Sequence, residues 1–184
     1  MRAFLDFEAS SLAKQSYPIE VAWVFEDGCS ESHLIRPLPA WTDWDVRAEA
    51  IHGIARATLE ADGEPVDAVA RRLLDALGGH VVYASSPSWD GKWLSVLLRA
   101  GGLPRHALRL RDTDDAQHES ALEVIGASLS ADEANSAAIK LAADVRAEQA
   151  DAPIAHRALA DAEHERQIWL AVCERARWMA GRQA

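Results

Sequence analysis

The sequence lacks the features of a disulfide scaffold, a zinc–thiolate site or a membrane protein. Its only two cysteines, Cys29 and Cys173, are far apart and have no Cys-x-x-Cys spacing, which argues for a reducing compartment. No apolar run approaches the roughly 18 residues of a transmembrane helix. The N-terminal MRAFLDFEAS is not typical of a secretory signal, because an acidic pair interrupts its apolar run. We therefore expect a cytoplasmic protein with no membrane partner.

Positive charge is also scarce. The chain has 19 Lys and Arg against 29 Asp and Glu, a formal net charge of -10. Proteins that hold duplex DNA by counterion release usually carry a basic face, and the sequence indicates no basic cluster. Either the chain binds no nucleic acid, or it binds a short piece through metal ions and local contacts. The sequence also lacks a Gly-x-Ser-x-Gly elbow and a phosphate-binding Gly loop.

The composition and the hydrophobic patterning predict one mixed α/β domain over residues 1–184. Hydrophobic residues make up 49% of the chain and charged residues 26%, as in soluble globular proteins. Strands come first and helices then alternate with strands, which favours this fold class. Expected strands are 3–7, 19–25, 32–35, 81–84 and 108–110. Expected helices are 66–77, 87–99 after an N-cap at Ser86, 113–149 with a break near 128–130, and 157–179, while 41–62 is predicted to be loop and short helices.

The first candidate site is Asp6 and Glu8, in the first expected strand. Residues i and i+2 of a strand point to the same face. Two carboxylates side by side in an apolar strand repel each other and lose hydration. A hard divalent cation with oxygen ligands would offset that cost. The alternative is that this face of the strand is simply exposed to solvent.

Two further segments carry candidate residues. Asp90 follows the expected strand 81–84 and falls in the first turn of the next helix, where the helix dipole favours an aspartate even without a function. His156 and Asp161 are five residues apart, so they converge only if His156 precedes the helix that holds Asp161. The loop 151–153 allows this, because Pro153 disfavours helix in the residue before it. A solvated histidine and a surface aspartate are the alternative.

In this order, the three motifs resemble those of the DEDDh 3′–5′ exonucleases, which include polymerase proofreading subunits, oligoribonuclease and ribonuclease T. The resemblance extends from residue 4 to about residue 165 and is most specific at LDFEASSL and AHRALADA. The segment Glu49–Ile54 also resembles a substrate-contacting segment of proofreading exonucleases. The chain departs from the family at Ala9-Ser10-Ser11, where Thr-Gly is usual, and at Ser85, Ser86 and Trp89, where an Asn and a Phe are common.

The resemblance implies an RNase H-like fold, with a mixed five-stranded sheet flanked by helices, and two Mg²⁺ or Mn²⁺ ions. Asp6, Glu8 and Asp161 would hold the ion nearer the attacking water. Asp6 would bridge to the second ion, and Asp90 would support that ion through bound water. His156 would be the general base. The implied activity is 3′–5′ hydrolysis of single-stranded DNA or RNA, which releases nucleoside 5′-monophosphates.

The terminal nucleotide also needs contacts from the protein. The candidates for wedging, stacking or polar contact are Ser11, Leu12, His52, Ile54, Trp89 and Trp93; core packing is the alternative for Trp93. Two other functions stay open: a catalytically weak RNase H-like module that binds proteins, and a proofreading partner of a separate polymerase. Retention of all five candidate site residues argues against the first. The sequence leaves a homodimer open and does not separate DNA, RNA and very short oligonucleotides as substrates.

Overall fold

A five-stranded mixed sheet forms the centre of the fold. The computed structural model describes residues 1–126, 129–149 and 156–181. The strand order is β3-β2-β1-β4-β5. β1 pairs antiparallel with β2 and parallel with β4, while β3 and β5 form the two edges. The strands are β1 (Arg2–Ala9), β2 (Pro18–Phe25), β3 (Ser30–Leu34), β4 (Val81–Ala84) and β5 (Leu110–Asp112).

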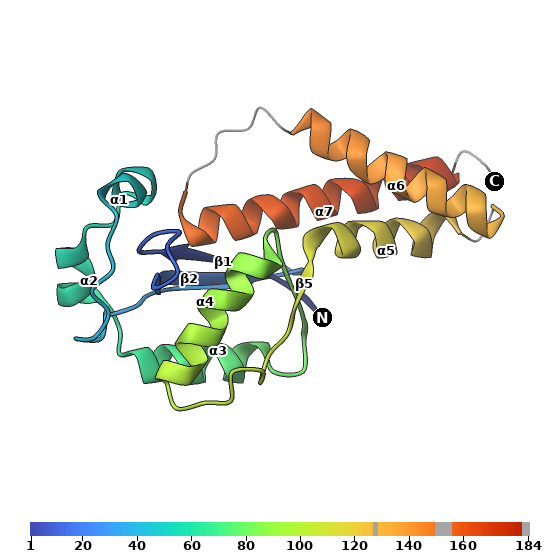
Figure 1. Cartoon of the computed structure of the whole chain (residues 1–184). Helices are drawn as coiled ribbons and strands as arrows, with labels where there is room; N and C mark the ends of the chain where they lie inside the picture. The colour runs from blue at the N-terminus through green and yellow to red at the C-terminus, as the bar shows by residue number, and fades with distance from the viewer. Residues whose placement is uncertain (127–128, 150–155, 182–184) are drawn as a thin grey trace.

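Helices cover both faces of this sheet (Figure 1). α3 and α4 pack on one face, where Leu5 and Phe7 of β1 join the largest apolar cluster. α5 and α7 pack on the other face, where Phe4 contacts the cluster that contains Trp169. The helices are α1 (Val46–His52), α2 (Arg56–Asp62), α3 (Val66–Leu77), α4 (Pro87–Ala100), α5 (Thr113–Ile125), α6 (Ala131–Glu148) and α7 (Ala158–Gly181).

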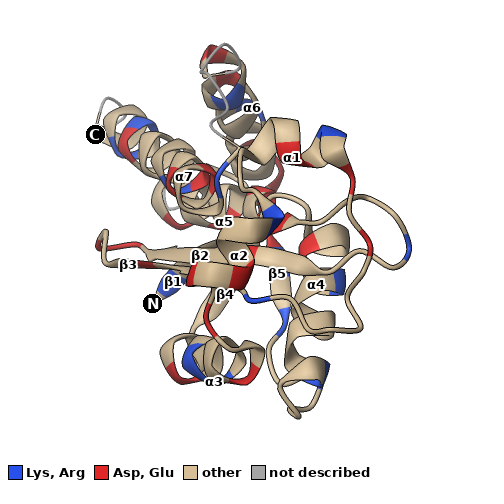
Figure 2. Cartoon of the chain, turned by 90° about the vertical axis from the view of Figure 1, so that its left-hand side faces the viewer, with Lys and Arg blue, Asp and Glu red and all other residues tan. Residues whose placement is uncertain are grey.

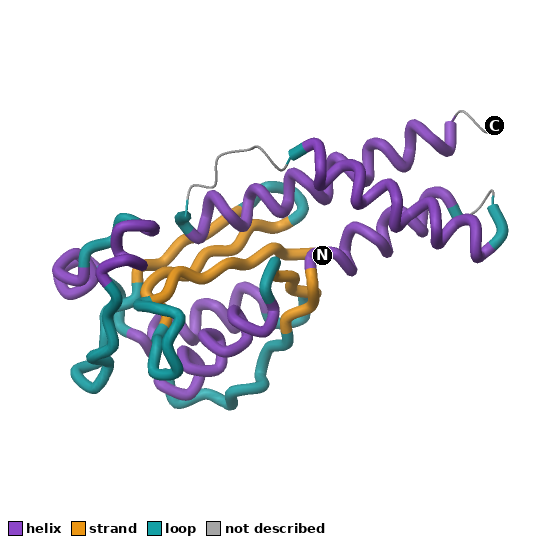
Figure 3. The backbone as a smooth tube through the Cα atoms, turned by 45° about the horizontal axis from the view of Figure 1, so that its top comes forward, coloured by secondary structure: helices purple, strands orange, loops and turns teal. Residues whose placement is uncertain are grey.

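The last three helices extend beyond the sheet on the side of the C-terminus (Figures 1 and 3). A separate apolar cluster joins them, with Ile125 on α5, Leu141 on α6 and Val172 on α7 fully or almost fully buried. α6 begins after Ser130, whose backbone N–H donates to the Glu133 carboxylate at 3.2 Å. That bond satisfies one of the donors that a helix start leaves open. α7 therefore packs against the sheet at one end and against α5 and α6 at the other.

The predicted fold class is confirmed, and most predicted elements lie within two residues of the observed ones. The helix 66–77 and the strand 81–84 have the predicted bounds. The Asp27-Gly28 turn joins β2 to β3, with Gly28 at a positive φ of 94°. The last strand was predicted too early, since β5 is Leu110–Asp112. The predicted loop 151–153 lies outside the described residues. Among the described residues, no helix is both long and apolar enough to cross a membrane.

Candidate metal centre

β1 turns Asp6 and Glu8 toward α7. Alternate residues of this strand are buried in opposite apolar clusters: Phe4 packs with α7, whereas Leu5 and Phe7 pack with the α3 and α4 layer. Asp6 and Glu8 share the face of Phe4, because side chains two apart in a strand point the same way. The prediction that the two carboxylates share a face agrees with this pattern. Both are partly buried, so the strand does not simply present them to solvent.

α7 brings a third carboxylate to the same place. Asp161 lies in the first turn of this helix, and its backbone N–H donates to the carbonyl oxygen of Arg157 at 3.0 Å. One carboxylate oxygen each from Asp6, Glu8 and Asp161 all lie within 4.8 Å of one another. Three carboxylate oxygens at this spacing suit a hard divalent cation, which takes oxygen ligands. The structure thus brings together residues from the first and the last of the three sequence motifs.

Asp90 adds a buried carboxylate from the opposite layer. It lies in the first turn of α4, and 2% of it is exposed. Its backbone N–H donates to the Ser86 carbonyl oxygen at 3.0 Å. Its Oδ2 atom is buried and has no hydrogen-bond partner among the described residues. A buried acceptor without a donor is costly, and a bound cation or its water would satisfy this atom.

Burial and mutual repulsion raise the pKa values of the carboxyl groups in the absence of a cation. For Asp6, desolvation and then the charges of Asp90, Glu8 and Asp161 hold the pKa well above its ordinary value. Desolvation, with Asp161 and Glu20 next, raises the pKa of Glu8 to about 7. Desolvation also raises the pKa of Asp90 to about 7, against the effect of its backbone hydrogen bonds. These raised pKa values show that the ionised carboxylates destabilise one another, and a bound cation would neutralise their charge.

A fifth acidic residue, Glu20, ties α7 to the sheet. Glu20 lies on β2 directly opposite Glu8, and 1% of it is exposed. Its Oε1 accepts from Arg157 Nη2 at 2.6 Å, and its Oε2 accepts from Arg157 Nε at 3.0 Å. Oε2 also accepts from the backbone N–H of Ala158 at 3.1 Å. These bonds fix the start of α7, and with it the position of Asp161.

Sequence reasoning missed Glu20 and Arg157. One signal was present: Glu20 is the only charged residue in the apolar strand PIEVAWVF. Its importance depends on the pairing of β1 with β2, which places Glu8 opposite Glu20. Like charges directly opposite each other destabilise a sheet, so Arg157 is needed to offset this pair.

His156 precedes α7, as the sequence predicted. It is exposed and has a positive φ of 48°, a left-handed conformation that histidine adopts more readily than most residues. The helix begins two residues later, at Ala158. His156 is therefore held next to the Glu20–Arg157 ion pair, on the chain segment that leads into Asp161.

The six predicted substrate contacts divide into exposed and buried side chains. Leu12 is 71% exposed and Trp89 is 39% exposed, so both present apolar surface to solvent. Ser11, His52, Ile54 and Trp93 are buried. Trp93 stacks on Trp89 with ring centroids 5.6 Å apart, and its indole N–H donates to Ser16 Oγ at 3.1 Å. Its core packing matches the alternative weighed from the sequence.

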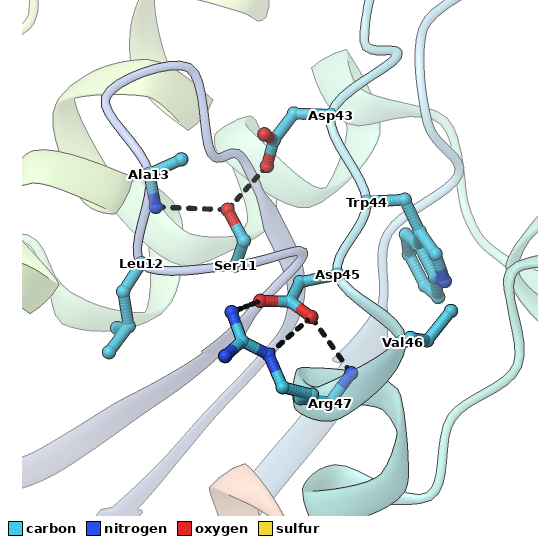
Figure 4. A pocket seen from close by; sticks show the side chains of 8 residues that line it. All are labelled: Ser11, Leu12, Ala13, Asp43, Trp44, Asp45, Val46 and Arg47. Carbon is cyan, nitrogen blue, oxygen red and sulfur yellow. Dashed lines mark hydrogen bonds and ion pairs between the residues drawn. The ribbon is translucent and has the colours of Figure 1, made fainter.

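A pocket of about 530 Å³ lies between the β1–β2 loop and the start of α1 (Figure 4). Ser11 Oγ donates to Asp43 Oδ2 at 2.5 Å and accepts from the Ala13 backbone N–H at 3.0 Å, which fixes one wall. Leu12 lines the same pocket. Beyond it, His52 Nδ1 accepts from the Ile54 backbone N–H at 3.0 Å, while the buried His52 Nε2 has no partner among the described residues. His52 contacts the Trp44 ring, and Ile54 belongs to the apolar cluster on which Trp44 packs, so both adjoin a side chain that lines the pocket.

Comparison with known proteins finds structures of exonuclease I among the neighbours of this chain. E. coli exonuclease I in complex with a dA16 oligonucleotide is 16% identical over 97% of this chain, with a TM-score of 0.64. Exonuclease I of Methylocaldum szegediense is 16% identical over 95% of this chain, with a TM-score of 0.63. The chain spans only 42% and 40% of the two neighbours. No protein-family model and no curated protein sequence matches the chain. The fold is the RNase H-like fold of these exonucleases.

Proposed function

We propose that this chain is a metal-dependent 3′–5′ exonuclease that acts on single-stranded DNA or RNA and releases nucleoside 5′-monophosphates. The observation that carries the proposal is the meeting of Asp6, Glu8 and Asp161, whose ligand oxygens lie within 4.8 Å of one another. The fold likeness to an exonuclease bound to a dA16 oligonucleotide supports the choice of reaction. The chain's DEDDh motifs occur in the same order as in that class of enzymes.

The four carboxylates fit two Mg²⁺ or Mn²⁺ ions. Asp6, Glu8 and Asp161 would hold one ion, and Asp6 with Asp90 would support the second. The unpartnered, buried Oδ2 of Asp90 and the raised pKa values of the cluster support this fit. Bound together, such ions activate a water and neutralise charge on a phosphodiester. The burial of Asp90 keeps bulk water from screening that charge.

His156 is the proposed general base. An imidazole takes up a proton near neutral pH, and this one lies at the exposed entrance to α7, five residues before Asp161. Its side chain is exposed in the part of the chain that the structure describes, so it would be able to approach a water at the carboxylates. The Glu20–Arg157 pair fixes the backbone on its C-terminal side.

Leu12 and Trp89 are the proposed contacts to the terminal bases. Both are exposed apolar side chains, and both adjoin the metal centre in sequence, Leu12 through β1 and Trp89 through Asp90. Aromatic stacking accepts any base, which suits an enzyme that removes successive nucleotides. Ser11, His52, Ile54 and Trp93 lie behind these surfaces and are proposed to shape them.

The test is a cleavage assay on 5′-labelled 16-nucleotide DNA and RNA and on dinucleotides, with Mg²⁺ or Mn²⁺. We expect a ladder that shortens from the 3′ end and a nucleoside 5′-monophosphate product. Asp6→Asn is the control and should leave no activity above background, because Asp6 lies in the shared carboxylate group. If neither metal supports shortening of any substrate, the proposal is wrong and a protein-binding role takes its place. Equal activity in Asp6→Asn would assign the cleavage to a contaminant.

A further inference from the structure

In one stretch of this acidic chain, all the charged side chains are basic. Residues 91–111 contain five Lys or Arg and no Asp or Glu, whereas the whole chain has 19 basic against 29 acidic residues. The sequence indicates no basic cluster because these charges are spread over 21 positions. Figure 2 shows blue positions along α4 and around β5. The fold thus brings basic residues together along α4 and toward β5 although they are scattered in the sequence.

The fold brings three of these five charged side chains, Lys92, Arg105 and Arg109, to one pocket. The segment 105–110 leads from the end of α4 to β5 and, with α4, encloses a pocket of about 380 Å³. Pro87, Gly91 and Ser95 line it from α4, and Arg105, His106 and Arg109 line it from the returning segment. The three α4 residues are four apart, so they form one stripe along the helix. The pocket thus has a helix stripe on one side and basic side chains on the other.

The two arginines of this pocket are available for a ligand. Arg105 and Arg109 are exposed, and within the described part of the chain neither forms a hydrogen bond or an ion pair. Arginines elsewhere are commonly paired with carboxylates, as Arg72 is with Glu31 and Arg175 with Glu148. Two unpaired guanidinium groups at one pocket favour an anion with several oxygens, because the guanidinium fork matches phosphate geometry.

The pocket adjoins the metal centre through the first turns of α4. Gly91 follows Asp90 directly, and Ser95 lies one turn farther along, roughly 6 Å by helix rise. Between them, Lys92 Nζ lies 5.1 Å from the centroid of the Trp89 ring and donates to Ala13 O and Ser16 Oγ at 2.7 Å each. Lys92 thus lines the pocket and contacts Trp89, which directly precedes Asp90 in the chain.

We propose that this pocket binds the backbone phosphates of the substrate strand on the 5′ side of the nucleotide at the metal centre. This proposal rests on the proposed exonuclease function. A strand held with its 3′ end at the carboxylates passes Trp89 and Lys92 and meets Arg105 and Arg109. A charged groove with an aromatic platform at one end is the usual arrangement for single strands. It also explains how an acidic protein binds a polyanion.

The experiment measures binding of a 5′-fluorescent 12-nucleotide oligothymidylate by anisotropy, in EDTA so that metal-dependent cleavage is prevented. The double variant Arg105→Gln/Arg109→Gln should bind about 10-fold or more weakly at 0.1 M salt. Its plot of log affinity against log salt should be shallower by about 1.4, because each phosphate contact to a single strand contributes about 0.7. A 12-nucleotide oligouridylate should show the same loss, since the contacts are to phosphates.

Arg36→Gln/Arg177→Gln is the matched control. Both residues are exposed and make no ion pair within the described residues, so this variant removes the same charge at distant sites and should bind as wild type does. A second comparison uses Gly91, where an added Cβ would meet nothing within 4 Å. Gly91→Glu should weaken binding several-fold relative to Gly91→Gln, because it places a carboxylate in the pocket.

The outcomes separate this inference from the proposed function. Equal losses in the two double variants, wild-type binding by Arg105→Gln/Arg109→Gln, or no binding by the wild-type protein would each overturn the inference. Cleavage in Mg²⁺ by a protein whose pocket variants bind normally would leave the exonuclease proposal standing. If the wild type binds through this pocket but cleaves nothing in Mg²⁺, the pocket would be a phosphate site and the exonuclease proposal would be wrong.

Discussion

Repulsion among buried carboxylates is the main energetic feature of the individual site residues. Glu8 and Asp90 each have a pKa raised to about 7, and the pKa of Asp6 is raised well above its ordinary value. Folding would proceed more favourably with neutral side chains at these positions, since desolvated like charges oppose it. Their presence together is better explained by a bound cation than by a contribution to the stability of the metal-free fold.

His156 is the residue whose role can be separated from metal binding. In His156→Ala we expect turnover of a single-stranded oligonucleotide to fall by about 10²–10⁴-fold, the range for loss of a general base. The affinity for Mn²⁺, measured by calorimetry, should stay within about twofold of wild type, because the carboxylates are unchanged. His118→Ala is a suitable control, since His118 is a partly buried histidine on α5 that pairs with Asn135. Wild-type turnover in His156→Ala would remove this residue from the mechanism.

At the scale of elements, the site depends on how one helix docks on one sheet. Asp161 meets Asp6 and Glu8 only if the first turn of α7 lies over the C-terminal half of β1. The apolar contacts of Trp169 and Ala162 with Phe4 hold the body of the helix there. The Glu20 carboxylate holds its first turn by accepting from both Arg157 and the Ala158 backbone. Glu20 is thus a positioning residue for Asp161.

This docking gives a prediction for Glu20→Gln. The amide oxygen can still accept from Ala158, but the ion pair with Arg157 is lost. We expect Mn²⁺ affinity and turnover to fall together by about 10–100-fold, as for partners that orient metal ligands, and the free energy of unfolding to fall by about 1–3 kcal/mol. A purely structural role would lower the melting temperature and leave Mn²⁺ affinity unchanged.

Glu163→Gln is the matched control for this prediction. It makes the same chemical change on α7, at a side chain that pairs with Arg166 near the surface. Surface pairs of this kind contribute about 1 kcal/mol or less, so we expect small effects on stability and none on metal affinity. If both variants lose metal affinity equally, Glu20 has no special position.

A helix or strand could be predicted from the sequence where the pattern of apolar residues within that element is strong. α3 was predicted to the residue because its buried side chains repeat at helical spacing. β5 was misplaced because three residues, none fully buried, carry little periodic signal. In the candidate site, Asp6, Glu8 and Asp161 were found from motif order, whereas Glu20 required the β1–β2 register. Burial of Ile54 depends on contacts between distant segments, which sequence spacing alone does not specify.

At the scale of the whole molecule, the distribution of charge matters more than its total. The net charge of -10 argues against general binding to polyanions, yet the acid-free stretch 91–111 gives one side of α4 the opposite sign. A polyanion would be repelled from most of the surface and attracted to one path that leads to the metal centre. Under the proposed function, such an arrangement would orient a nucleic-acid strand by repulsion as well as by attraction.

The stability of the whole molecule should also depend on the charge state of the carboxylates at the candidate metal centre. Glu8 and Asp90 hold protons in the folded, metal-free protein up to about pH 7, whereas in the unfolded chain they ionise near their ordinary pKa values. Between about pH 4.5 and 7 the folded state therefore binds more protons, so its stability falls as pH rises. In exposed pairs such as Arg72 with Glu31, the hydrogen bond from the arginine lowers the pKa of the carboxyl group. Their contribution to stability therefore changes with pH mainly below about pH 4.5.

We therefore predict that in EDTA the protein melts roughly 5–10 °C lower at pH 8.0 than at pH 5.5, since a kilocalorie shifts the melting temperature by about 2–4 °C at this size. Mn²⁺ should raise the melting temperature more at pH 8.0, where the carboxylates are ionised and no protons need be displaced. His52 acts in the opposite sense, because burial lowers its pKa, so the variant Asp90→Asn is needed to isolate the carboxyl groups. Asp90→Asn should have a shallower pH dependence in EDTA and a smaller response to Mn²⁺, and scanning calorimetry measures both. If the wild type and Asp90→Asn, both without metal, each melt higher at pH 8.0 than at pH 5.5, the carboxylates do not repel each other as their burial requires.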